Sequence, residues 1–302
     1  MEKVRGDSKK SFWADMSLFL TALLWGGGFV AVKDAVSNVT PFYMLAIRFL
    51  AASIFLTVVF RKKFKGIRKQ DIVSGSIVGV FLFLSMAAQT IGIQYTAAGK
   101  QAFLTTVYVV IIPFFVWIVD KKKPDAYSIM SALLTFIGIS FLSISSEFKL
   151  SMNLGDWITL VSAFLFAAHI VSIAHFTKDT NPIVLSVLQM SFAGIMSLIF
   201  ALIFEGKFIG INSNAVFSMF YIIIFSTTIP FLIQNVAQKY THPNHAGIIL
   251  SFESVFGAIL SVIFLRDVFT INMILGCIII FIAVIICETK LSFLKNIKKS
   301  DL

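Results

Sequence analysis

Four ionisable residues, Arg48, His169, His175 and Glu253, lie inside long apolar stretches of this sequence, His175 near the end of its stretch. A charge held in an apolar membrane interior is costly, so such residues commonly mark the path of a solute or a proton. Glu253 lies about seven residues, or roughly 10 Å of helix, into its stretch. A short carboxylate at that depth must face a wet cavity, pair with a cation or stay protonated. We therefore predict that Glu253 binds solute and couples proton movement; the alternative is a structural carboxyl bonded to a neighbouring helix.

Neutral polar side chains on other stretches are candidates for the same cavity. Gln101, Thr105 and Tyr108 recur at spacings of four and three residues, which places them on one face of a helix. Gln89 and Gln234 each offer two amide donors and an acceptor, which suits a zwitterionic or polyol solute. The alternative for this set is hydrogen bonding between helices, which small polar residues often provide in membranes.

Three further positions have two interpretations each. Trp25 lies in mid-stretch beside the glycines at 26–28, which predicts an aromatic wall next to a close helix approach; plain packing is the alternative. His169 is a candidate proton carrier that lines the same cavity, although a histidine satisfied by core hydrogen bonds is the commoner case. Arg48 could snorkel to the surface or pair with Glu253, and we predict a gating or structural role for it.

Composition identifies the class of protein that holds these residues. Of 302 residues, 58% are hydrophobic and 13% are charged, against about 45–50% apolar and about 25% charged residues in soluble domains. A soluble core of this length could not bury so much apolar surface. The chain is therefore predicted to be an integral membrane protein, which excludes a secreted enzyme, a nucleic-acid binder and a disordered chain.

The apolar residues gather in stretches of the length needed to span a bilayer, which is about 20 residues. Ten stretches qualify: 14–33, 41–60, 72–94, 101–119, 127–145, 157–176, 183–204, 215–237, 246–265 and 270–287. The predicted fold is therefore all-α, with ten transmembrane helices. Pro113 and Pro230 lie inside two of these stretches and predict kinks or local breaks with a gating or structural role.

Positive charges predict the orientation in the membrane. Of the 25 Lys and Arg residues, 19 lie in segments on one side of this topology and five on the other, while Arg48 remains inside a stretch. The side richer in Lys and Arg is normally cytoplasmic. Both termini are therefore predicted to be cytoplasmic in a multi-pass protein of the cell membrane.

Weak internal similarity divides the chain into two halves, 1–150 and 151–302. An offset of 145 residues aligns Gln89 with Gln234 and opposes Tyr108 to Glu253. Because each half holds five predicted helices, an odd number, the second half must enter the membrane upside down. Inverted repeats are typical of transporters, whose solute site lies between the halves near the membrane midplane.

Five motifs in order give the sequence a family resemblance. They are LLWGGGFVAVKDAV, then Pro41 with Arg48, AFLTTVYVVIIP at 102–113, Gly155-Asp156, and AGIILSFESVFGAILSVIFLRD at 246–267. With these motifs, residues 15–288 resemble the EamA-type branch of the drug/metabolite transporter superfamily. Ser254 stands where that family usually has Pro, and Arg266-Asp267 where it has Gly-Glu. The resemblance implies solute transport, commonly export of amino acids or other metabolites.

The predicted function is secondary transport of a small polar metabolite, such as an amino acid, by alternating access with possible proton coupling. The stretches 127–145 and 270–287, being the most uniformly apolar, are predicted to lie at the periphery.

Besides the solute, only membrane lipids are expected as partners, and the protein is expected to be a monomer or a homodimer. No cofactor and no catalytic residue is predicted, and the histidine pair His242 and His245 lacks the further ligands of a metal site. The alternatives are a non-transporting scaffold or sensor and a membrane-embedded lipid-modifying enzyme.

Overall fold

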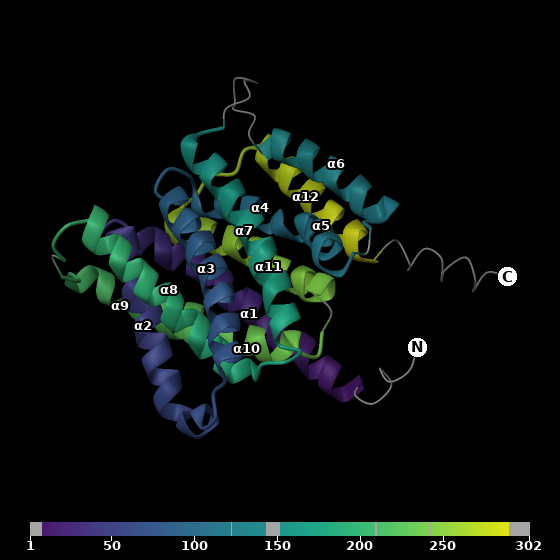
Figure 1. Cartoon of the computed structure of the whole chain (residues 1–302). Coiled ribbons are helices and arrows are strands. Elements are labelled where there is room, and N and C mark those ends of the chain that lie inside the picture. The colour runs from purple at the N-terminus through teal and green to yellow at the C-terminus, as the bar shows by residue number, and fades with distance from the viewer. Residues whose placement is uncertain (1–7, 122, 143–151, 209, 242, 290–302) are drawn as a thin grey trace.

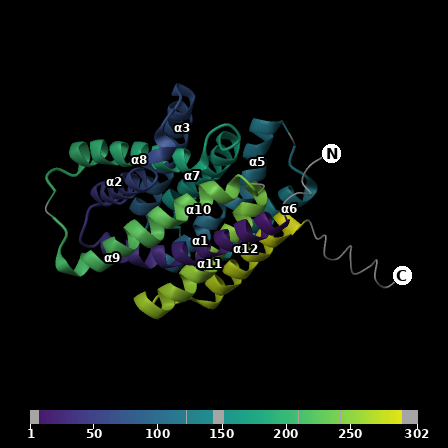
Figure 2. The ribbon, with the colours of Figure 1, turned by 90° about the horizontal axis from the view of Figure 1, so that it is seen from below.

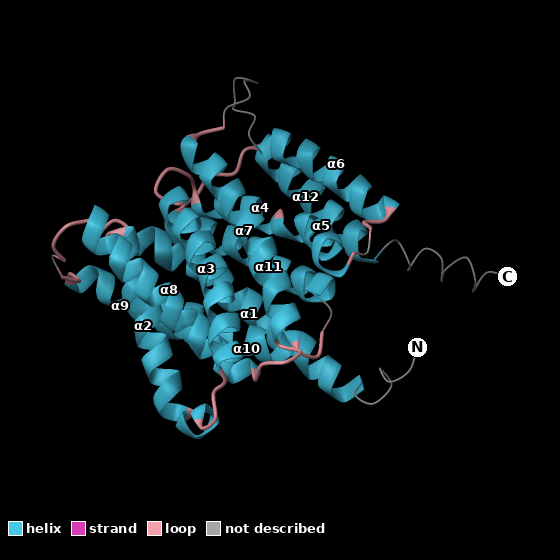
Figure 3. Cartoon of the chain, in the orientation of Figure 1, coloured by secondary structure: helices cyan, strands magenta, loops and turns pink. Residues whose placement is uncertain are grey.

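The computed structural model describes residues 8–121, 123–142, 152–208, 210–241 and 243–289, and these form helices without any strand (Figure 3). In chain order the helices of the first half are α1 (Ser8–Ala35), α2 (Pro41–Val59), the short 3-10 turn η1 (Arg61–Phe64), α3 (Lys69–Gly92), α4 (Ala98–Thr106), α5 (Tyr108–Asp120) and α6 (Ala126–Leu142). Those of the second half are α7 (Leu154–Phe176), α8 (Pro182–Phe204), α9 (Ser213–Ile223), the π-helical turn η2 (Ile224–Thr228), α10 (Ile229–Gln238), α11 (Pro243–Leu265) and α12 (Ile271–Thr289).

Eight segments of the described chain are long and apolar enough to cross a membrane. Two of them are composite: α4 and α5 form one segment, Ala98–Val119, and α9 to α10 form another, Ala215–Gln238. The segments of the remaining two predicted spans, Ala126–Phe141 and Ile271–Ile286, are apolar but shorter. The all-helical fold predicted from the sequence is therefore observed, and its eight long apolar segments are consistent with a membrane protein.

The helices of the two halves interleave. Extensive packing joins α1 to α11, α2 to α8 and α3 to α7, so the central contacts cross from one half to the other. At one edge α6 and α12 lie side by side (Figures 1 and 2). Large apolar side chains on the outer faces are exposed, among them Phe136, Phe217 and Phe264. An apolar exterior of this kind matches a lipid environment.

Both predicted proline interruptions are present. The helix that contains Pro113 is broken at Val107, between α4 and α5, and the helix that contains Pro230 begins with the π-helical turn η2. A proline has no N–H for the carbonyl four residues earlier, and its ring crowds that carbonyl. For Pro230 the affected carbonyl is that of Ser226, which lies within η2, whereas the break at Val107 lies six residues before Pro113, beyond the carbonyl that this proline leaves unpaired.

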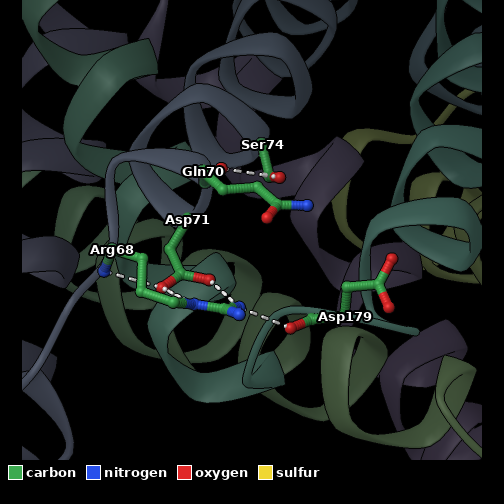
Figure 4. Close-up of polar contacts among 5 residues, drawn as sticks. All are labelled: Arg68, Gln70, Asp71, Ser74 and Asp179. Atoms are coloured by element: carbon green, nitrogen blue, oxygen red, sulfur yellow. Dashed lines mark hydrogen bonds and ion pairs between the residues drawn. The ribbon is translucent and has the colours of Figure 1, made fainter.

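Polar contacts tie the two halves together near both ends of α3. Before its first turn, the Arg68 guanidinium donates to the Asp71 carboxylate at 2.9 Å and to the Asp179 carbonyl at 2.8 Å (Figure 4). The hydrogen bond with Asp71 raises the pKa of Arg68, so this pair stays ionised at neutral pH. Beyond the other end of α3, Lys100 pairs with the buried Asp156 at 2.7 Å.

Candidate functional site

A cavity lies at the centre of the helices, where elements of both halves meet. Space open to the centre of a water molecule amounts to about 40 Å³, which is enough for a few waters. Its lining includes every predicted substrate-binding residue: Trp25, Gln89, Thr105, Tyr108, His169, Gln234 and Glu253. The structure thus brings together side chains from α1, α3, α4, α5, α7, α10 and α11, whereas α6 and α12 contribute none of the described lining. That these residues bind a solute remains a prediction.

Glu253 and Tyr108 form the polar wall contributed by α11 and α5. Both are buried, at 5% and 2% exposure, and the Tyr108 hydroxyl lies next to the Glu253 carboxyl. The hydroxyl interacts with the carboxyl, although it makes no hydrogen bond of full geometry within the described chain. The pairing of Tyr108 with Glu253 across the halves, predicted from the 145-residue offset, places one acid and one hydroxyl at the same point of the cavity.

Amide and imidazole groups form the second polar wall. Gln89 donates to the Thr105 hydroxyl at 3.3 Å, and Gln101 donates to the Gln89 carbonyl at 2.7 Å. The His169 Nε2 lies 2.9 Å from the Gln189 Oε1, but its Nδ1 has no partner among the described residues. His169 is therefore half satisfied: its Nε2 is anchored in the core, and its Nδ1 is buried without a hydrogen-bond partner among the described residues.

Arg48 takes neither of the two positions considered from the sequence. At 1% exposure it does not snorkel to the surface, and within the described chain it makes no ion pair with Glu253. Instead its Nε donates to the Thr227 hydroxyl at 2.7 Å and its Nη2 to the Ser226 carbonyl at 3.2 Å. The arginine thus joins α2 to η2 and lines the cavity.

Pro230 explains why the Ser226 carbonyl is free to accept these bonds. Ser226 is four residues before Pro230, so the proline removes the N–H that a regular helix would supply to it. Trp25 Nε1 also donates to this carbonyl, at 3.1 Å, in addition to Arg48. The local defect in the helix therefore orients an aromatic ring and a guanidinium at the cavity.

The glycines beside Trp25 allow α1 to approach its neighbours closely. A Cβ at Gly26 would lie 2.5 Å from the Phe256 Cβ and 2.9 Å from the Gly257 nitrogen on α11. A Cβ at Gly28 would lie 2.4 Å from the Ser226 Oγ on η2. Only hydrogen fits at Gly26, while a side chain at Gly28 would displace the Ser226 hydroxyl. The close approach predicted from the sequence is thus present, and it brings Trp25 and Glu253 to one site.

Two polar lining residues were not predicted from the sequence to bind solute. Arg48 on α2 and Ser226 on η2 both border the cavity, although a gating or structural role was predicted for Arg48 and none for Ser226. Hydrogen-bonding groups left without a partner would have identified these residues as part of the site, but such groups can be recognised only once the tertiary contacts are known.

Within the described chain no group of three or more His, Cys, Asp or Glu residues could hold a metal. His242 and the side chain of His245 lie outside the described part.

The chain is similar to transporters throughout its length. The EamA-like transporter family matches residues 12–144 and 153–288. An uncharacterized transporter of Archaeoglobus fulgidus is 35% identical over 281 residues, which cover 93% of this chain and 87% of that protein. The uncharacterized transporter YoaV of Bacillus subtilis is 24% identical over 276 residues, with coverages of 88% and 93%. A solved crystal structure with 15% identity superposes with a TM-score of 0.68 over 93% of this chain and 99% of the other, a likeness of fold alone.

Proposed function

Because this chain belongs to the EamA-like transporter family, we propose that it moves a small polar metabolite across the cell membrane by alternating access. The observation that carries the proposal is the central cavity, which gathers polar side chains from both halves of an otherwise apolar bundle. We further propose ten transmembrane helices, cytoplasmic termini and export as the direction of transport. These details follow from the hydropathy pattern, the distribution of Lys and Arg, and the family resemblance.

An inverted repeat of two five-helix halves, 1–150 and 151–302, is supported by the pattern of helix contacts. A two-fold operation that exchanges the halves pairs α1 with α7, α3 with α10, and α4 with α11. The contact of α1 with α10 then has its equivalent in that of α7 with α3, and the contact of α1 with α11 in that of α7 with α4. Each of these equivalent contacts is present, and the family match likewise falls once in each half.

Unpaired hydrogen-bonding groups around the cavity support a polar solute, such as an amino acid or a related compound. The described chain offers no partner to four lining atoms: Gln101 Oε1, Tyr108 OH, His169 Nδ1 and Gln234 Oε1. Buried polar atoms without partners are costly. A solute that supplies donors and acceptors at these points would recover that cost, whereas an apolar solute would not.

Proton coupling through Glu253 is the second part of the proposal. The groups that share its cavity are Tyr108 on α5, Arg48 on α2 and His169 on α7. A neutral carboxylic acid avoids the cost of a charge when the cavity is closed and dry, and an ionised one becomes tolerable when water or a cationic group enters. The two access states would then differ in their affinity for a proton, which is what coupling requires.

The test measures uptake of a mixture of the standard L-amino acids into proteoliposomes, with and without a pH gradient. We expect gradient-dependent accumulation of at least one amino acid with the wild-type protein and none that depends on the gradient with Glu253→Gln. The matched control, Asp179→Asn, removes a carboxylate from an exposed loop remote from the cavity and should behave like the wild type. Equal gradient-driven rates in the wild type and Glu253→Gln would leave Glu253 with a structural role only.

A further inference from the structure

Arg48 holds a positive charge in a buried position where no carboxylate of the described residues pairs with it. Within the described chain it makes no ion pair, whereas Lys100 pairs with Asp156 at 2.7 Å and Arg68 with Asp71 at 2.9 Å. A buried charge is normally paired, because leaving it without a counter-charge is strongly destabilising. An anion in the cavity next to Arg48 would remove this imbalance.

The donors of Arg48 are only partly used. A guanidinium has five N–H groups. The Nε donates to the Thr227 hydroxyl at 2.7 Å, and the Nη2 contacts the Ser226 carbonyl at 3.2 Å and its hydroxyl at 3.4 Å. The Nη1 contacts only the Met86 Sδ, at 3.9 Å, and a thioether is a weak acceptor. The N–H groups on Nη1 are therefore the donors that remain for a ligand.

The position of the guanidinium is set before any ligand arrives. Thr227 and Ser226 hold one edge of the planar group, and the guanidinium carbon lies 5.4 Å from the centre of the Phe49 ring. A planar cation anchored on one edge loses little freedom when its other edge binds a carboxylate. The Pro230 defect thus produces a preorganised anion receptor by freeing the Ser226 carbonyl.

A group of opposite charge lines the same cavity. Glu253 and Arg48 both border it, yet they are farther apart than the 4.0 Å of an ion pair. The two groups therefore remain separate, with the amides of Gln89 and Gln234 also in the lining. A ligand whose carboxylate and ammonium groups span the separation of Arg48 and Glu253 would satisfy both charges at once, whereas a simple anion or a simple cation would satisfy only one.

We propose that Arg48 binds the carboxylate of the solute, whose ammonium group faces Glu253, so that the cavity takes zwitterions of the α-amino acid class. This assignment rests on the proposed transport function and adds Arg48 to the solute-binding residues. It also accounts for the retention of a buried arginine on α2, which a role in joining α2 to η2 would not require, since neutral hydrogen-bonding side chains could make those contacts.

The test compares each standard L-amino acid with its carboxamide, which keeps the amine but lacks the carboxylate. Thermal stabilisation of the full-length protein in detergent reports binding without requiring transport. We expect the wild type to bind at least one amino acid about 10- to 100-fold more tightly than its carboxamide, the range of a charge-assisted hydrogen bond. Arg48→Gln should abolish this preference, and Arg48→Lys, which keeps the charge but not the fork, should retain part of it.

The controls separate binding from folding and from transport. Arg68→Gln removes an arginine outside the cavity and should leave the preference unchanged. If Arg48→Gln does not fold, the Arg48→Lys variant decides. If residue 48 has only a structural role, this variant should bind the amino acid and its carboxamide with the same affinity ratio as the wild type. A wild-type ratio in either Arg48 variant overturns the assignment. Proteoliposomes that move only uncharged solutes would refute the zwitterion class while leaving transport intact, and proteoliposomes that move no solute would refute transport itself.

Discussion

At the scale of single residues, the surroundings of the Tyr108 hydroxyl favour a solute-binding role for this residue over a role in packing alone. The residue is 2% exposed, yet its hydroxyl has no hydrogen-bond partner among the described residues. A buried tyrosine that serves packing normally uses its hydroxyl in a hydrogen bond. The Tyr108 hydroxyl instead lies beside the Glu253 carboxyl without a hydrogen bond of full geometry, where a solute or a proton would meet both groups.

Tyr108→Phe should therefore weaken binding without weakening the fold. The melting temperature should stay within about 2 °C of the wild type, because no hydrogen bond is lost. Affinity for the transported solute should fall about 2- to 12-fold, the value of one neutral hydrogen bond. Melting curves and concentration-dependent uptake by the same preparations measure the two effects.

Tyr43→Phe is the matched control for this prediction. The Tyr43 hydroxyl donates to the Gly206 carbonyl at 2.6 Å, away from the cavity lining. This variant should lower the melting temperature and leave solute affinity unchanged. The reverse pattern, with Tyr108→Phe destabilised and fully able to bind, would show that the Tyr108 hydroxyl is structural.

At the scale of elements, the approach of α1 to α11 depends on Gly26. An alanine Cβ there would lie within 2.5 Å of the Phe256 Cβ and 2.9 Å of the Gly257 backbone nitrogen, neither of which can move without moving α11. We expect Gly26→Ala to destabilise the protein by about 1–3 kcal/mol, the usual cost of overpacking. Thermal unfolding in detergent measures the loss.

Gly27→Ala provides the comparison on the adjacent residue. A Cβ at Gly27 would first meet the Tyr221 hydroxyl, the far end of a side chain that can shift once its hydrogen bond to the Leu24 carbonyl is given up. Its effect on the melting temperature should therefore be smaller than that of Gly26→Ala. Equal losses in both variants would mean that the α1–α11 contact is not limited by backbone approach.

The irregular helix η2–α10 yields a second prediction at this scale. Pro230→Ala restores an N–H that can bond the Ser226 carbonyl within the helix and so competes with Arg48 and Trp25 for it. We expect slower amide hydrogen exchange in η2 together with weaker solute binding. Pro182→Ala, at the first turn of α8 where a proline costs nothing, should change neither quantity. Unaltered hydrogen exchange in η2 after Pro230→Ala would show that the proline does not cause the π-helical turn.

At the scale of the whole molecule, the proposed orientation follows from the charge distribution and is open to direct labelling. Lys65 lies between η1 and α3, Lys207 lies between α8 and α9, and both are exposed. In a background without Cys277 and Cys287, we expect Lys207→Cys to react with a membrane-impermeant maleimide added outside intact cells. Lys65→Cys should react only after the cells are opened. Labelling of Lys65→Cys in intact cells would invert the topology.

The candidate site was largely predictable because polar side chains are scarce in an apolar chain. Trp25, Gln89, Tyr108, Gln234 and Glu253 stood out for their depth in apolar stretches, and the structure brings all of them to one cavity. The contacts of Arg48 could not be predicted from the sequence, for a specific reason. Its acceptor, the Ser226 carbonyl, is 178 residues away along the chain, and nothing in the surroundings of Arg48 reveals that Pro230 has freed it.

The sequence by itself determined the membrane class, the positions of the helices and the two interruptions, because these depend on local hydropathy and on the missing N–H of Pro113 and Pro230. Which faces of the helices meet was decided only by the tertiary structure. Helix α1 packs closely against α11 at Gly26, and Arg48 joins α2 to η2. These contacts place Arg48 and Glu253 at separate positions in the lining of one cavity. Side-chain packing between helices sets their rotation, and that packing joins residues too distant in the chain for any local pattern to report.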